Sequence, residues 1–121
     1  MATFRKFEEI DTWRKARQVN LALYRVTREA PLAQDYFLRD QIRRAGISIM
    51  ANIAEGFGRS SRKEFARFIS ISMGSVVEVQ SHLYVALDLQ YIDQATFDEL
   101  YCRLAEITRM CGSLKYHLLN C

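Results

Sequence analysis

Residues 38–56 read LRDQIRRAGISIMANIAEG, and the pattern of this stretch sets the architecture that the rest of the chain follows. Apolar side chains recur in it every three or four residues, which predicts a helix over about residues 38–55. Gly56 comes next, and we expect it to end the helix in the left-handed conformation that glycine tolerates. The side chains expected to face a core are Leu38, Ile42, Ala45, Ile49 and Ile53.

One helix is predicted before this stretch and another directly after it. Apolar residues at helical spacing place the earlier helix at residues 12–29, with Asp11 as its N-terminal cap and Pro31 beyond its end. The later helix begins at the capping box Ser61-x-x-Glu64 and runs to about residue 89. Its expected core residues are Phe65, Phe68, Ile69, Ser72, Val76, Val79, Leu83 and Ala86.

The last helix is predicted from Asp93, where Ile92 and Phe97 occupy the two positions of a hydrophobic staple. The connections between the predicted helices are short, so successive helices are expected to run antiparallel. The predicted fold class is all-α, an antiparallel up-down-up-down four-helix bundle in a single domain over residues 1–121. The apolar stripe of the last helix is Phe97, Leu100, Leu104, Ile107, Cys111, Leu114 and Leu118.

The composition agrees with a helical protein and excludes several other classes. Hydrophobic residues make up 50% and charged residues 26% of the 121 residues, which excludes a disordered chain. One Pro and five Gly are too few for the many turns of a β-sandwich. The longest uncharged runs, residues 45–54 and 68–77, are shorter than the roughly 18 residues of a membrane span. Three cysteines without CxxC spacing, and no apolar signal stretch, predict a reduced, cytoplasmic protein.

Two of the predicted helices carry more apolar residues than one bundle face needs. The helix over residues 38–55 has a second apolar side beside Arg43, and the helix over residues 61–89 has a second apolar stripe about a quarter-turn from its core line. In a chain of this size another subunit normally covers such a second face. We therefore expect a homo-oligomer, and the alternative is a skewed monomer that hides the same side chains. The expected interface residues are Ile47, Met50, Ala54, Met73, Val77, Tyr84 and Tyr91.

A polar stripe accompanies the core stripe of the helix over residues 38–55. Its members recur at spacings of 3, 4, 4 and 3, so neighbours can hydrogen-bond to each other. Such a stripe fixes helix register or subunit geometry more readily than it performs chemistry. The five residues are Gln41, Arg44, Ser48, Asn52 and Glu55.

The same helix carries a set of motifs that resembles the bacterial four-helix-bundle family named for the 23S ribosomal RNA intervening-sequence protein. The resemblance implies a cytosolic four-helix bundle that assembles as a pentameric ring and has no known enzymatic activity. It also implies motif roles for Gln41, Arg43, Arg44, Ser48, Asn52, Glu55 and Gly56. The motifs are Gln41-Ile42-Arg43-Arg44-Ala45, Ser48-Ile49 and Asn52-Ile53-Ala54-Glu55-Gly56, followed by Gly58-Arg59 and Phe65-x-x-Phe68.

Positive charge is concentrated in the first half of the chain. Residues 1–67 hold fourteen basic and eight acidic side chains, a net charge of +6, whereas residues 68–121 hold three and six, a net charge of −3. Two basic groups are candidate nucleic-acid or anion sites, and no aromatic residue is expected among the arginines of the first to stack on bases. The alternative interpretation is a solvated outer face. The first group is Arg14, Arg17, Arg25 and Arg28, and the second is Arg59, Arg62, Lys63 and Arg67.

No catalytic, metal or cofactor site is predicted. His82 and His117 lack a nearby cysteine or carboxylate at metal-ligand spacing, and Glu55 has no partner that would make it a general base. The loop after Gly56 lacks the GxxxxGK[ST] pattern and follows a helix instead of a strand, which argues against nucleotide hydrolysis. Two hypotheses remain: a non-enzymatic homo-oligomeric assembly or interaction module, or a sequence-nonspecific binder of structured RNA or DNA that uses its basic surface.

Overall fold

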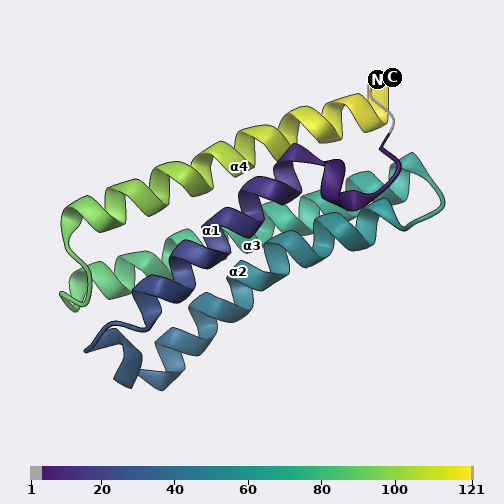
Figure 1. Cartoon of the computed structure of the whole chain (residues 1–121). Coiled ribbons are helices and arrows are strands. Elements are labelled where there is room, and N and C mark those ends of the chain that lie inside the picture. The colour runs from purple at the N-terminus through teal and green to yellow at the C-terminus, as the bar shows by residue number, and fades with distance from the viewer. Residues whose placement is uncertain (1–3, 121) are drawn as a thin grey trace.

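The structure, a computed structural model, describes residues 4–120 (Figure 1). Its element order is η1 (Phe7–Glu9), α1 (Asp11–Thr27), η2 (Leu32–Gln34), α2 (Tyr36–Phe57), α3 (Arg62–Asp88) and α4 (Gln94–Asn120), where η denotes a short 3-10 helix. The four long helices lie side by side, and residues 4–120 contain no strand. The all-helical prediction is confirmed.

Capping residues start three of the helices. The Ser61 hydroxyl accepts from the backbone N–H of Glu64 at 3.1 Å, as the capping box predicts. An Asp93 carboxylate oxygen accepts from the N–H of Thr96 at 2.8 Å and starts α4 in the same way. Asp35, which the sequence reasoning did not single out, caps α2.

The prediction that Asp11 caps α1 is wrong. Ile10 holds the capping position without a side-chain hydrogen bond, and Asp11 already lies in the first helical turn. There its carboxylate lies 3.5 Å from the Arg14 guanidinium. An apolar residue occupies the cap because Ile10 is itself part of the core, with 1% of its surface exposed.

One hydrophobic core runs between the helices, and the predicted stripes supply most of it. All five core residues expected in α2 are buried, as are all eight expected in α3. In α4 the stripe is buried from Phe97 to Leu118 except at Leu114, which is partly exposed and packs against the core. The helical periodicity therefore identified the buried faces correctly.

Gly56 does not end α2 in the left-handed conformation, so that prediction is wrong. It lies inside the helix, and Gly58 is the C-terminal cap with a right-handed φ of −76°. A Cβ at Gly56 would meet the Phe68 Cβ at 2.7 Å and a ring carbon of Phe65 at 2.9 Å. The glycine is needed because α2 and α3 approach each other closely here.

A buried amide joins α1 to α2. The Asn20 side-chain nitrogen donates to the backbone oxygen of Gly46 at 2.7 Å and to that of Ala16 at 3.1 Å. A Cβ at Gly46 would lie 2.8 Å from the Asn20 side-chain oxygen. The missing side chain thus makes room for a polar contact that sets how α1 lies on α2.

None of the helices in residues 4–120 combines the length and the apolarity that crossing a bilayer requires.

Candidate functional site

The outer face of α1 carries the first predicted basic group. Arg14, Arg17, Arg25 and Arg28 are all exposed, and their spacing places them on one side of the helix. The Arg14 Nε donates to the backbone oxygen of Glu8 at 2.7 Å. Within residues 4–120 the other three arginine side chains form no ion pair. Their charge is therefore directed to the solvent.

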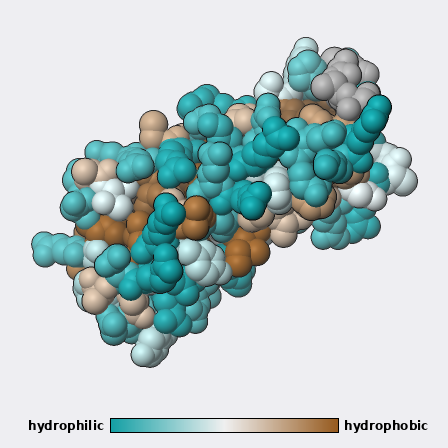
Figure 2. Space-filling view, in the orientation of Figure 1, coloured by the Kyte–Doolittle hydropathy of each residue, from teal (hydrophilic) through white to brown (hydrophobic). Residues whose placement is uncertain are grey.

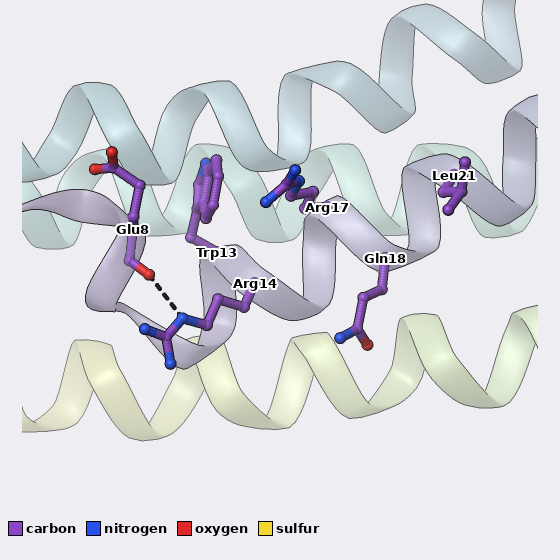
Figure 3. A pocket seen from close by; sticks show the side chains of 6 residues that line it. All are labelled: Glu8, Trp13, Arg14, Arg17, Gln18 and Leu21. Atoms are coloured by element: carbon purple, nitrogen blue, oxygen red, sulfur yellow. Dashed lines mark hydrogen bonds between the residues drawn. The ribbon is translucent and has the colours of Figure 1, made fainter.

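An open groove of about 660 Å³ lies along this face of α1 (Figure 3). Trp13 is half-buried in it, and the Arg17 guanidinium carbon lies 5.9 Å from the centre of the Trp13 ring. The expectation that no aromatic residue lies among these arginines is therefore wrong. A spacing of four residues puts Trp13 and Arg17 on one helix face, and that signal was present in the sequence. The groove is lined by Glu8, Trp13, Arg14, Arg17, Gln18 and Leu21.

The second predicted basic group is largely committed to contacts within the chain. Arg59 pairs with Glu55 at 2.6 Å, and Arg67 pairs with Glu64 at 3.1 Å. The hydrogen bond from Arg67 lowers the pKa of Glu64 and raises the pKa of Arg67. Both arginines also lie over the ring of Phe68, each 4.6 Å from its centre. These guanidinium groups are held by acidic and aromatic neighbours instead of converging on one anion.

Arg62 has a structural role that the sequence reasoning missed. Its Nη2 donates to the backbone oxygen of His117 at 2.7 Å, and its Nε donates to that of Leu118 at 3.1 Å. These carbonyls belong to the last turn of α4, where side-chain donors commonly satisfy helix-terminal oxygens. Arg62 thus ties the start of α3 to the end of α4, 56 residues further along the chain. Lys63 is exposed.

The polar stripe of α2 lies against α3. Arg44 donates to Gln41 at 2.9 Å and pairs with Glu78 of α3 at 2.8 Å. The Ser48 hydroxyl lies 2.8 Å from that of Ser75, and the Asn52 amide donates to Ser48. The predicted hydrogen bonds between neighbours in the stripe are confirmed at these positions. The stripe joins two helices of one chain and presents no free reactive group.

Arg43 lies on the other side of α2. Its Nε donates to the Thr27 hydroxyl at 2.8 Å, and its guanidinium carbon lies 4.4 Å from the centre of the Tyr24 ring. This motif arginine therefore faces α1, whereas Arg44 and Ser48 face α3. Ile47 lies on α2 between the side that faces α1 and the side that faces α3. It points outward, with 46% of its surface exposed.

The predicted interface residues fall into two sets. Ile47, Val77 and Tyr84 are exposed apolar side chains, at 46%, 59% and 49% of their surface. The others are partly buried, and Met50, Met73 and Tyr91 pack against the core of their own chain. Tyr91 also donates its hydroxyl to Asp35 at 3.0 Å, and this bond raises the pKa of Tyr91. The partly buried set, which also includes Ala54, is Met50, Ala54, Met73 and Tyr91.

The remaining chemistry-bearing side chains do not form a reactive cluster. In residues 4–120 no three side chains of His, Cys, Asp or Glu gather as metal ligands. His82 lies 3.5 Å from Glu78 on the same helix, at the seam with α2. Burial raises the pKa of the Cys111 thiol to about 12, which keeps it protonated and unreactive. Cys121 lies outside the described residues.

Fold and surface together define a small all-helical protein with a basic, grooved face on α1 and exposed apolar side chains on α2 and α3. The chain belongs to the family of the 23S rRNA-intervening sequence protein, whose family model matches residues 8–113. None of the curated proteins matches it in sequence.

A solved structure supports the fold. It is a crystal structure of a protein with unknown function from the S23 ribosomal protein family of Bacteroides thetaiotaomicron. The TM-score is 0.78 and the sequence identity 21%, over 86% of this chain and 97% of that chain. At this identity the likeness concerns the fold alone.

Proposed function

We propose that this chain is a non-enzymatic assembly or interaction module of the cytosol, an up-down-up-down four-helix bundle that forms a homo-oligomer. The observation that carries the proposal is the exposure of Ile47, Val77 and Tyr84, three large apolar side chains on the middle helices. Large apolar side chains that gather on an exposed helix face mark a protein–protein contact, and Val77 and Tyr84 lie two turns apart on one face of α3. Figure 2 shows apolar side chains breaking the hydrophilic surface on the face where α1 and α2 lie in front.

The contacts between α2 and α3 support the proposed topology. Arg44 pairs with Glu78, whereas Ser48, further along α2, pairs with Ser75, earlier in α3. Residue numbers thus rise along one helix as they fall along the other. The tight turn near Gly58 favours the same direction for this pair.

The positions of the exposed side chains favour a ring. Ile47 lies on the outer side of α2, whereas the Tyr84 ring lies on α3 toward α4, 4.8 Å from the Phe97 ring and 6.0 Å from the Tyr101 ring. Two different faces suit a head-to-tail contact, in which one subunit's α2 meets the next subunit's α3 and α4. Head-to-tail contacts that close form rings. Five is the subunit number that the family resemblance implies.

Light scattering after size exclusion tests the assembly. The wild-type protein should have a mass several times that of one 14.1 kDa chain, and Ile47→Asp and Val77→Asp should each reduce it to that of the monomer. The matched control is Leu89→Asp at the end of α3, because Leu89 is 52% exposed and lies outside both faces. A wild-type mass equal to one chain at all concentrations would contradict the proposal.

A second candidate function is sequence-nonspecific binding of structured RNA or DNA. The observation that favours it is the row of exposed arginines on α1, three of which form no ion pair within residues 4–120. Arginine suits phosphate contacts because its planar guanidinium donates in pairs. An oligomer multiplies the row and strengthens its field.

Fluorescence anisotropy with a labelled structured ribosomal-RNA fragment tests this function. Binding should weaken with salt, with a slope of log K against log salt of roughly −3 to −4 if four phosphates are neutralised. Combined replacement of Arg14, Arg17, Arg25 and Arg28 by Ala should abolish it. Arg25→Ala alone should weaken binding, and Arg109→Ala, at an exposed position of α4, is the charge-matched control for that single replacement. Absence of binding at low salt would refute this candidate.

A further inference from the structure

The groove on α1 has a feature that the row of arginines does not explain, namely an indole at its edge. Trp13 rests edge-on against Phe7, with ring centres 5.0 Å apart and planes at 69°. Phe7 thereby supports the indole and leaves the Trp13 ring half-exposed toward the groove. In Figure 3 Trp13 and Arg17 project toward one edge of this outer face of α1, whereas Arg14 and Gln18 project toward its other edge.

The Trp13–Arg17 pair is unusually open. Four other arginine–aromatic contacts in the described chain are closer, with guanidinium carbons 4.4–4.8 Å from the ring centre. Arg17 lies 5.9 Å from the Trp13 ring centre. A flat ring between two others needs two stacking steps of about 3.4 Å each, so Arg17 must move outward by at least about 1 Å to admit one. We call the Trp13–Arg17 pair the jaw, and it accommodates one flat ring once Arg17 has shifted outward.

We propose that this jaw takes one unpaired base of a single-stranded nucleic acid, stacked between the Trp13 indole and the Arg17 guanidinium. Neighbouring phosphates lie on Arg14 and on the arginines further along α1. Aromatic and guanidinium planes are the usual platforms for unpaired bases, since every base has a π-face. The inference rests on the second candidate function and assigns its substrate class, unpaired in preference to duplex nucleic acid.

The charged side chains around the jaw favour binding of a base over binding of a phosphate or an acidic side chain in the same place. Glu8 is the one acid that lines the groove, and in Figure 3 its side chain projects to the same side as Trp13. A carboxylate repels a phosphate or an acidic peptide, but it accepts a hydrogen bond from an amino group of a base. The cations lie on the flanks, where the phosphates of a bound strand would run.

The fluorescence of Trp13 provides a direct test, because Trp13 is the only tryptophan in the sequence. The probes are a short labelled oligodeoxyadenylate and its duplex with oligothymidylate, titrated at low salt and followed by both anisotropy and tryptophan emission. The single strand should bind and quench Trp13, and the duplex should quench it far less. Polyglutamate serves as the acidic polymer control and should leave the emission unchanged.

Two variants test the two sides of the jaw. Trp13→Leu keeps an apolar group against Phe7 but removes the π-face, and it should weaken single-strand binding roughly fivefold to a hundredfold. Arg17→Lys keeps the charge but loses the plane and should weaken both the binding and the quenching. Arg109→Lys on α4 is the matched control and should bind as the wild type does. Circular dichroism checks each fold, and if Trp13→Leu fails to fold, Arg17→Lys decides.

The outcomes separate the inference from the function on which it rests. Anisotropy that rises without quenching, or equal quenching by duplex and single strand, means that the arginines bind phosphate alone. In that case nucleic-acid binding stands and the base jaw is refuted. Quenching by polyglutamate equal to that by the oligonucleotide also refutes it, because the occupant is then an acidic polymer. No anisotropy change at low salt with any nucleic acid refutes the function itself.

Discussion

Substitution of Gly56 by Ala tests the close approach of α2 and α3. The new Cβ would lie 2.7 Å from the Phe68 Cβ and 3.2 Å from the Phe65 backbone oxygen, whereas ordinary contacts begin at 3.4 Å. Neither atom can rotate away, so the helices must separate by about 0.7 Å at this point. Such overpacking costs about 1–3 kcal/mol, and the better helix propensity of Ala offsets about 1 kcal/mol of it. We expect a net loss of about 1 kcal/mol in the free energy of unfolding.

Gly74→Ala is the matched control, because Gly74 also lies inside a helix but has nothing within 4 Å of its added Cβ. It should gain about 1 kcal/mol from helix propensity alone. We therefore expect Gly56→Ala to lower Tm and Gly74→Ala to raise it, by about 3–5 °C each for a chain of this size. Thermal unfolding followed by circular dichroism measures both changes. If Gly56→Ala is stabilised as much as Gly74→Ala, the close approach is not real.

Three further predictions concern single groups. Arg62→Ala should lower the free energy of unfolding by about 1 kcal/mol and increase hydrogen exchange in the last turn of α4, because it removes the hydrogen bonds from Arg62 to the His117 and Leu118 carbonyls. Unchanged exchange there would refute this role. The N–H groups at the start of α4 hold the pKa of Asp93 below its ordinary value of 3.8. The ionised Asp93 carboxylate therefore stabilises the fold above pH 4, and this stabilisation is lost as the pH falls through the lowered pKa. Urea titrations at several pH values should show a smaller decrease in the free energy of unfolding at acid pH for Asp93→Asn than for the wild type. A thiol reagent should label exposed Cys102 in the folded protein but reach buried Cys111, whose pKa is about 12, only after unfolding, as peptide mass spectrometry will show.

Most of the fold follows from local patterns. The core residues of α2 and α3 are readable from the sequence because a helix returns to the same face every 3.6 residues. The caps at Ser61 and Asp93 are readable because a capping side chain bonds to an N–H three residues away. The predictions for Gly56 and Asp11 are wrong because each depends on contacts outside the local pattern. The close approach of α3 requires a glycine inside α2 at position 56, and the burial of Ile10 puts that residue, instead of Asp11, at the capping position of α1.

Less of the candidate site is readable from the sequence. The exposed arginine row on α1 was predicted, since it depends only on helical spacing within one segment. That Arg59 and Arg67 share the ring of Phe68, and that Arg62 reaches the end of α4, depends on contacts between separate segments. For this reason two groups that look alike in sequence differ in their neighbours, one facing solvent and the other mostly occupied.

Sequence patterns alone specify the four helices, their buried faces and the two basic groups, because each depends on chemistry repeated within one helix. The packing of the helices decides which charged side chains face the solvent and which form ion pairs or hydrogen bonds within the chain. It brings Phe7 against Trp13 and leaves Arg17 apart from the indole, and it turns Gly56 from a helix end into a point of contact. The physical reason is that burial and pairing are properties of the space between segments, which no periodicity within a single segment records.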